Sequence, residues 1–577
     1  MPPWFAPSVA LLAVATGPSS AEEFATYAVV SQESHASDVG REVLRKGGNA
    51  IDSAVATAFA LAVTHPAAGN IGGGGFIVAF VADRGEVVTY DFRERAPRAA
   101  TERTYLSPEG RLLPRYRAGL WAGGVPGTVR GLALAHEQLG TLDWAELVRP
   151  AVDLAERGFP VSDTLARSLN AQLFVDDGAA DLLDGSGRGA RLADFPASVA
   201  AFRKPDGTPW VEGDVLRQPD LAATLSRVAE DGPDAFYAGE IADRIAEAMR
   251  AGGGLISEED LESYEAVRRA PVHGTFRGFD VFGMGPPSSG GIVTVLMLNL
   301  LERFDLAADG PEDPETLHRI TEAMRRAFFV RATEIADPDF VDVPVDELTS
   351  KDFADELAGS IGPIATPSED LADFPIAGLV AEGTDTTHLS VLDGDGNAVA
   401  LTYTLEQGYG SKAVVPGLGF LLNNEMGDFN LVPGVTSTSG LIGTRPNVIA
   451  PGKRMLSSMS PTIVLEDGKV RLVTGSPGGR TIPNTVLWVV LNVLEFGRSP
   501  REAVDAPRSH HSWFPDRLTL EGDSWPEAAI QGLRDRGHRV RSTPLQGDAH
   551  SIVVDPGTGI IHGVNDRRRS TSKASGG

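Results

Sequence analysis

One β-hairpin places the strongest constraint on how this chain can fold. Residues 386–391 (TTHLSV) alternate as a strand, a Gly/Asp-rich turn follows, and residues 398–405 (AVALTYTL) have the pattern of the returning strand. This arrangement predicts an antiparallel hairpin. If the hairpin turns about Asp395, Thr386 faces Thr404, within one residue for a bulge. Two hydroxyl groups are therefore expected to meet at the beginning of one strand.

The first threonine of this pair is a candidate nucleophile. A polar, glycine-containing segment precedes Thr386, and cleavage there would leave Thr386 as a new N-terminus. An N-terminal threonine carries its own base, because its α-amino group titrates near ~7.7–8.0 and lies beside its Oγ. It is one known form of activated nucleophile. Threonine is also common in strands, so composition alone would leave Thr386 and Thr404 as ordinary strand residues.

The rest of the chain predicts an α/β sandwich with a large helical lobe. The glycine run 72–75 precedes two strands and is interpreted as a tight backbone crossing, since no Lys-Ser/Thr follows it. From residue 123 to about residue 376 the pattern is mostly helical, and Ser288-Ser289 is expected to cap an apolar helix. No long linker flanks this region, and strands return afterwards, which favours one intertwined domain. The expected strands outside the hairpin include 76–82, 86–92, 462–465, 470–474 and 549–554.

Composition limits the partners and the chemistry. The chain has 577 residues and no cysteine, which excludes disulfides and thiolate nucleophiles. Its formal charge of −27 argues against binding nucleic acid or anionic membranes. Residues 9–16 are apolar and small residues follow at 19–21, so residues 1–22 are a possible signal peptide, although the first basic residue is Arg41. The protein is therefore expected to be periplasmic or secreted, without any other segment long enough to span a bilayer.

Several other residues could serve a threonine nucleophile. Gly478 and Gly479 precede a helix and could direct backbone N–H groups at an oxyanion. Arg93 follows a strand and could bind a carboxylate in a bidentate manner. Taken singly, these residues could equally be a loop turn and a surface ion pair. Three acids could bind an ammonium group or a metal, or could be solvated loop charges; they are Glu406, Glu425 and Asp428.

Taken together, these residues lie in motifs that strongly resemble those of the gamma-glutamyltransferases. This family of N-terminal-nucleophile (Ntn) hydrolases folds as a four-layer αββα sandwich. The resemblance covers nearly the whole chain from about Tyr27. It rests on motifs in the family's order: GGNAIDSAVA (47–56), GGGGF (72–76), DFRERAP (91–97), GVPGTVRG (124–131), PPSSGG (286–291), DPDF (337–340), TTHLSV (386–391), LLNNEMGDF (421–429), LSSMSPTIV (456–464) and GSPGG (475–479).

The resemblance implies a self-cleaving precursor. Cleavage between Asp385 and Thr386 would give a large subunit, 23–385, and a small subunit, 386–577. Mature Thr386 would attack the γ-amide of a γ-glutamyl compound such as glutathione, and the acyl-enzyme would pass to water or to an amino acid or peptide. No cofactor or metal is implied. The implied roles are Thr404 positioning the nucleophile; Gly478 and Gly479 as oxyanion hole; Arg93, Ser457 and Ser458 binding the α-carboxylate; and Glu406, Glu425 and Asp428 binding the α-amino group.

Two departures and two alternatives accompany this interpretation. Glu406 stands where many members carry Asn, and Ser439-Gly440 stands where some bacterial members place an aromatic that covers the pocket. A looser lid would change the balance of hydrolysis and transfer. One alternative is a related Ntn acylase that cleaves glutaryl or cephalosporin-type amides, although such substrates lack the ammonium that the three acids would bind. The other is an unprocessed, inactive homologue that only binds glutamyl compounds or partner molecules.

Overall fold

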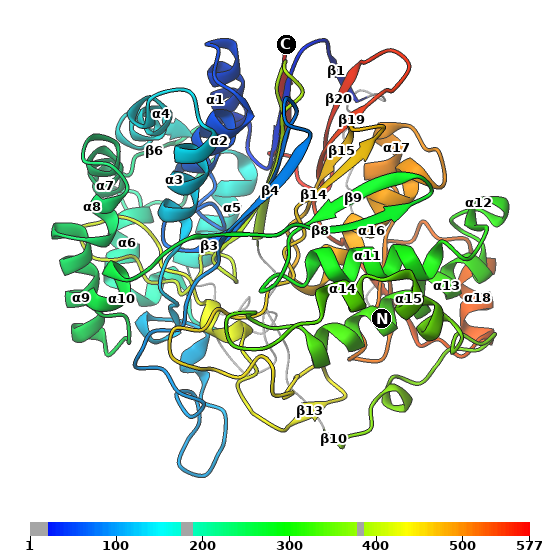
Figure 1. Cartoon of the computed structure of the whole chain (residues 1–577). Coiled ribbons are helices and arrows are strands. Elements are labelled where there is room, and N and C mark those ends of the chain that lie inside the picture. The colour runs from blue at the N-terminus through cyan, green and yellow to red at the C-terminus, as the bar shows by residue number, and fades with distance from the viewer. Residues whose placement is uncertain (1–20, 175–188, 378–385) are drawn as a thin grey trace, which may run out of the picture.

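A computed structural model describes residues 21–174, 189–377 and 386–577, and its centre consists of two seven-stranded sheets (Figure 1). Two predictions about processing concern residues outside these ranges. Asp385, on one side of the expected cleavage site, is not described, and neither are residues 1–20 of the expected leader 1–22.

The predicted hairpin lies at the middle of the first sheet. This sheet has the order β21-β2-β11-β12-β3-β4-β7. In β11–β12 pairing, Thr386 is opposite Thr404, which confirms the predicted register. The Asp393 carboxylate fixes the turn by accepting the amide N–H groups of Asp395 and Asn397 at 3.0 and 2.9 Å. The strands are β2 (Ala28–Ser31), β3 (Gly74–Val81), β4 (Glu86–Phe92), β7 (Val267–Arg269), β11 (Thr386–Leu392), β12 (Ala398–Thr404) and β21 (Lys573–Gly576).

The second sheet is also antiparallel and has the order β1-β20-β19-β15-β14-β9-β8. Its strands are β1 (Glu22–Phe24), β8 (Val272–Phe276), β9 (Phe279–Gly283), β14 (Thr462–Glu466), β15 (Lys469–Thr474), β19 (His550–Val554) and β20 (Ile561–Asn565). The chain crosses from the first sheet to the second between β7 and β8. These crossing strands lie inside the region that was predicted to be mostly helical.

Alternation along the strands makes the four layers. In β11, Leu389 and Val391 join the apolar core beneath one set of helices, whereas Leu392 joins the core between the sheets. In β14, Ile463 faces the other sheet and Val464 faces the second set of helices. The order is therefore helices, sheet, sheet, helices, which confirms the αββα sandwich.

The helices divide between the two outer layers (Figure 1). Those over the first sheet include α1 (Ser34–Arg45), α2 (Ala50–Thr64), α3 (Thr128–Leu139), α4 (Trp144–Arg157), α5 (Asp163–Leu173), α7 (Pro219–Glu230) and α9 (Glu240–Gly252). Those over the second include α11 (Gly290–Leu301), α13 (Pro314–Glu334), α15 (Lys351–Ala358), α16 (Ile482–Leu494), α17 (Pro500–Asp505) and α18 (Glu527–Asp535). Within the described part of the chain, no helix has the length and apolarity needed to cross a bilayer.

The expected serine cap of α11 is formed only in part, because the Ser288 hydroxyl accepts the amide N–H of Gly290, the first residue of the helix, at 2.9 Å. Ser289 occupies the N-cap position, but its side chain makes no capping hydrogen bond. Instead the Ser289 hydroxyl donates to the carbonyl of Ser457, and the Ser288 hydroxyl donates to the carbonyl of Met459, each at 2.7 Å. Both serines therefore hold the 457–459 segment against the start of the helix.

Candidate active site

The two threonines lie where the inner face of the first sheet ends. Thr386 and Thr404 are both buried, and their hydroxyl oxygens are 3.4 Å apart. The amide of Glu406 donates to Thr404 Oγ1 at 2.8 Å, and the side-chain amide of Asn70 donates to the Thr404 carbonyl at 2.9 Å. The end of β12 is thus held from two directions, which fixes its hydroxyl beside Thr386.

The glycine run 72–75 allows the ends of β12 and β4 to approach the start of β3 closely. A Cβ at Gly73 would overlap the carbonyl oxygen of Thr404, and one at Gly74 would overlap the carbonyl oxygen of Phe92. The interpretation as a tight backbone crossing is therefore confirmed. It matters for the site because β4 ends at Phe92, so Arg93 comes directly after this close approach.

Arg93 is fully buried among acids. Its Nη1 is 2.7 Å from Glu425 Oε2 and its Nη2 is 2.5 Å from Asp428 Oδ2. A third carboxylate, that of Glu94, lies 3.4 Å from Nη1. Burial lowers the pKa of Arg93, but these carboxylates outweigh it and raise that pKa above its ordinary value. The arginine is a permanent cation held at the centre of three acids.

Arg93 does not fully offset the burial of the acids in this cluster. Burial raises the pKa of Glu94 to about 7 and that of Glu425 well above its ordinary range, with Arg93 opposing both shifts. Within the described residues, Glu425 Oε1 and Glu94 Oε1 accept no hydrogen bond, whereas Glu425 Oε2 is held by the ion pair with Arg93. Unsatisfied buried carboxylate oxygens are costly. An ammonium group with three N–H donors would match them.

The predicted residues converge on one pocket. Every predicted site residue except Gly478 and the undescribed Asp385 lines it: Thr386, Thr404, Arg93, Glu406, Glu425, Asp428, Ser457, Ser458 and Gly479. Gly478 lies on the wall of an adjoining groove. Two positions in this group have backbone angles that favour glycine, since φ is +136° at Gly478 and +57° at Gly479.

Glu406 has an unusual backbone for a residue with a side chain. Its φ is +76°, a conformation that costs energy in non-glycine residues and that clusters at functional sites. The side-chain amide of Asn424 donates to its carboxylate, and its amide holds Thr404. Glu406 therefore connects the Thr386–Thr404 pair to the acidic side of the pocket.

Two arginines of the pocket were missed from the sequence. Arg331 of α13 donates to Ser458 Oγ at 2.9 Å and to Ser289 Oγ at 3.1 Å. Arg480 directly follows Gly479 and donates to the Gly440 carbonyl at 2.9 Å. Nothing in the local sequence distinguishes Arg331 from the other arginines of its helix. Arg480 could have been found, because it adjoins the predicted oxyanion-hole glycines.

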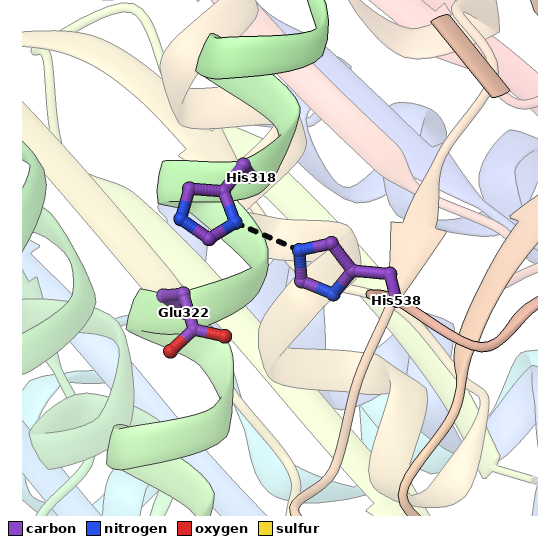
Figure 2. A group of neighbouring side chains, drawn as sticks. All are labelled: His318, Glu322 and His538. Carbon is purple, nitrogen blue, oxygen red and sulfur yellow. Dashed lines mark hydrogen bonds between the residues drawn. The ribbon is translucent and has the colours of Figure 1, made fainter. Parts of the chain in front are cut away.

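Elsewhere, three buried side chains lie close enough to share a metal ion: His318, Glu322 and His538 (Figure 2). The His318 Nε2–H donates to the Gly362 carbonyl, and the two rings are joined from His538 Nε2 to His318 Nδ1, both at 2.8 Å. Two nitrogens bound to one tetrahedral zinc at ~2.0–2.1 Å would be roughly 3.3 Å apart.

Both carboxylate oxygens of Glu322 in this cluster already accept hydrogen bonds from arginines. Arg325 Nε donates to Glu322 Oε1 at 3.1 Å and Arg326 Nη1 to Oε2 at 2.6 Å. Burial lowers the pKa of His538 to about 3, so its ring is neutral. We interpret the cluster as a hydrogen-bonded network that ties α13 to the loop after α18.

Comparison with known proteins identifies the family. The family model described as Gamma-glutamyltranspeptidase matches residues 36–576. The chain is similar to a glutathione hydrolase proenzyme of Escherichia coli (strain K12), with 43% identity over 94% of this chain and 90% of the relative. It is also similar to an acylase ACY 1 proenzyme of Pseudomonas sp. (strain SE83), with 37% identity over 92% and 90% of the two chains.

A solved structure extends the likeness to the whole fold. The crystal structure of cephalosporin acylase from Bacillus halodurans matches with a TM-score of 0.82 and 27% identity, covering 99% of each chain. The family match spans the motifs that carry the pocket, from the DFRERAP segment to the GSPGG loop. The chain belongs to the gamma-glutamyltranspeptidase family.

Proposed function

We propose that the chain is an autoprocessing γ-glutamyl hydrolase and transpeptidase. In the precursor, Thr386 Oγ attacks the carbonyl carbon of Asp385, and the amide nitrogen becomes the α-amine of Thr386. Water then hydrolyses the resulting ester. The products are a large subunit, 23–385, and a small subunit, 386–577, after removal of residues 1–22 on export to the periplasm or medium. The observation that carries the proposal is Thr386 at the start of β11, beside Thr404 and in the charged pocket.

In the mature reaction, Thr386 supplies both the base and the nucleophile. The α-amine of Thr386 accepts the Oγ proton as Oγ attacks the γ-carbonyl carbon of the donor. The backbone N–H groups of Gly478 and Gly479 stabilise the oxyanion, and the leaving amine takes the proton. Water or a second amine then attacks the γ-glutamyl ester and releases glutamate or a γ-glutamyl peptide. Glutathione and related γ-glutamyl compounds fit this reaction.

The pocket binds the zwitterionic head of a glutamyl group by exchanging ion pairs. The α-carboxylate replaces Asp428 on Arg93, assisted by the Ser457 and Ser458 hydroxyls. The α-ammonium then supplies donors to Asp428, Glu425 and Glu406. A substrate that lacks the α-ammonium would displace Asp428 from Arg93 without supplying a new cation, and one that lacks the α-carboxylate would bring a cation without replacing Asp428 on Arg93.

A matched pair of variants tests the nucleophile. Thr386→Ala should abolish both chain cleavage and release of the chromophore from a γ-glutamyl anilide. Thr387→Val removes the hydroxyl of the adjacent buried threonine, whose side chain points to the opposite face of the strand, and should retain both. Chromophore release by Thr386→Ala at the wild-type rate would refute the assignment.

The second candidate is an amide acylase, favoured by the similarity to the Pseudomonas and Bacillus halodurans acylases. Glutaryl-type substrates lack the α-ammonium and would leave the buried Glu425 Oε1 without a donor. We therefore expect the chain to prefer γ-glutamyl over glutaryl amides that share one leaving group. A higher kcat/KM for the glutaryl compound would reverse this choice.

A further inference from the structure

A second cavity adjoins the oxyanion loop. It is a groove of about 520 Å³ bounded by Ser439-Gly440, by the 477–481 loop and by residues of the C-terminal region. Its lining carries four arginines and, within the described residues, no acid; the arginines are Arg480, Arg517, Arg568 and Arg569. In a chain with a formal charge of −27, this groove is a local reversal of sign.

Two of these arginines form ion pairs with acids that do not line the groove. Arg568 is bound between Glu521 and Asp566, and Arg569 lies 3.6 Å from Asp548. Arg517 is exposed, and Arg480 donates to the neutral carbonyls of Gly440 and Phe514 at 2.9 and 3.4 Å.

The field of these two cations reaches the groove wall. Burial lowers the pKa of His510, which lines the groove, to about 3, and Arg480 and Arg517 add to that shift. His510 is therefore neutral at physiological pH, and the cationic character of the groove comes from the arginines.

The groove lies where the amine side of a bound donor must extend. Arg480 lines both cavities, with Gly479 on the pocket side and Gly478 on the groove side. When the glutamyl head fills the pocket and its carbonyl lies at the glycines, the amide nitrogen points away from the head. The leaving amine exits by this route, and an acceptor amine must attack along the same route, because transfer is the reverse of acylation.

We propose that this groove binds the carboxylate of the amine-side fragment, both on the leaving peptide and on the acceptor peptide, with Arg517 as a specificity-determining residue. The inference rests on the proposed γ-glutamyl transfer. A dipeptide attacking with its α-amine places its C-terminal carboxylate several bonds into the groove. An exposed ion pair of this kind should change acceptor binding by roughly twofold to fivefold.

The test compares one dipeptide acceptor with a free carboxylate against its C-terminal amide, using a γ-glutamyl anilide as donor. We expect wild type to show a lower KM for the free dipeptide, and Arg517→Gln to reduce that preference by roughly twofold to fivefold. Arg534→Gln is the matched control, because Arg534 is exposed on α18 and does not line the groove. It should keep the wild-type preference. Added salt should weaken the wild-type preference and leave Arg517→Gln little changed.

The contrary outcomes separate the two claims. Equal acid-to-amide preference in wild type and Arg517→Gln would overturn the groove assignment. So would a wild type that releases glutamate from the donor but transfers to neither dipeptide. A wild type that neither releases glutamate nor forms a γ-glutamyl peptide would overturn the proposed function as well.

Discussion

At the scale of single residues, the pocket is built from charges that neutralise one another. The sequence predicted Arg93 as a carboxylate binder and Glu425 and Asp428 as ammonium binders. It could not predict that these residues pair directly, because the pairing depends on the end of β4 meeting the 425–428 turn in space. The proposed recognition of a glutamyl group therefore requires an exchange of ion pairs inside the protein.

Replacing Arg93 with lysine should separate geometry from charge. Lysine keeps the cation but cannot form the two-pronged contact with a carboxylate, so we expect the donor KM to rise by about tenfold or more while kcat falls less. Initial rates over a range of donor concentrations measure this. An unchanged KM with normal thermal stability would contradict the assigned role.

Glu94 should make donor binding depend on pH. Because burial raises its pKa to about 7, Glu94 becomes an anion beside Arg93 as the pH rises through 7 and then competes with the donor carboxylate. We expect the donor KM to rise above pH 7 in wild type and to stay flatter in Glu94→Gln. The same pH-dependence of KM in both proteins would contradict this account.

Glu94 should also make folding stability fall as the pH rises. Its folded pKa exceeds the ordinary 4.5, so the native state binds the proton more tightly than the unfolded chain does. Its contribution is fully present below pH 4.5 and is lost as the pH rises to about 7. Thermal unfolding of wild type and Glu94→Gln across this range measures the difference.

Thr404 should act through the position of Thr386. Thr404→Val keeps the shape but removes the hydroxyl 3.4 Å from Thr386 Oγ1, so we expect kcat to fall by about 10²-fold with little change in KM. Thr404→Ser restores the hydroxyl and should recover most of the activity. Similar kcat values for the valine and serine variants would show that the hydroxyl is not needed.

At the scale of elements, local patterns predicted the hairpin and the glycine crossing but not the strands β7 to β9. The hairpin is specified by its own alternation and by the Asp393 turn. The β7–β9 segments are short, and they become strands because β7 pairs with β4 and β9 pairs with β14. The hydrogen bonds that the Ser288 and Ser289 hydroxyls donate cannot be predicted locally either, since their acceptors lie more than 150 residues away.

The glycine crossing predicts a sharp local intolerance. In Gly73→Ala the new methyl group would overlap the Thr404 carbonyl, so we expect a loss of about 1–3 kcal/mol of stability together with impaired cleavage. Gly362→Ala is the control, because a Cβ there meets nothing within 4 Å. Equal unfolding temperatures and equal cleavage in the two variants would contradict the steric argument.

At the scale of the whole molecule, the sandwich gathers distant segments around one strand end. Arg93 follows β4, the acids follow β12, the serines precede β14 and the glycines follow β15. The sequence resemblance assigned roles to these residues, but only the stacking of the two sheets explains why they meet. The groove could not be predicted, because its arginines come from separate segments with no shared motif.

The central claim is that Thr386 becomes the N-terminus of a separate chain. Intact mass and N-terminal sequencing of freshly purified protein test it most directly. We expect two fragments, the smaller beginning at Thr386 with a free amine, and a single uncut chain for Thr386→Ala. A wild-type protein that releases glutamate from a γ-glutamyl donor while remaining one uncut chain, or while cut at another residue, would contradict it.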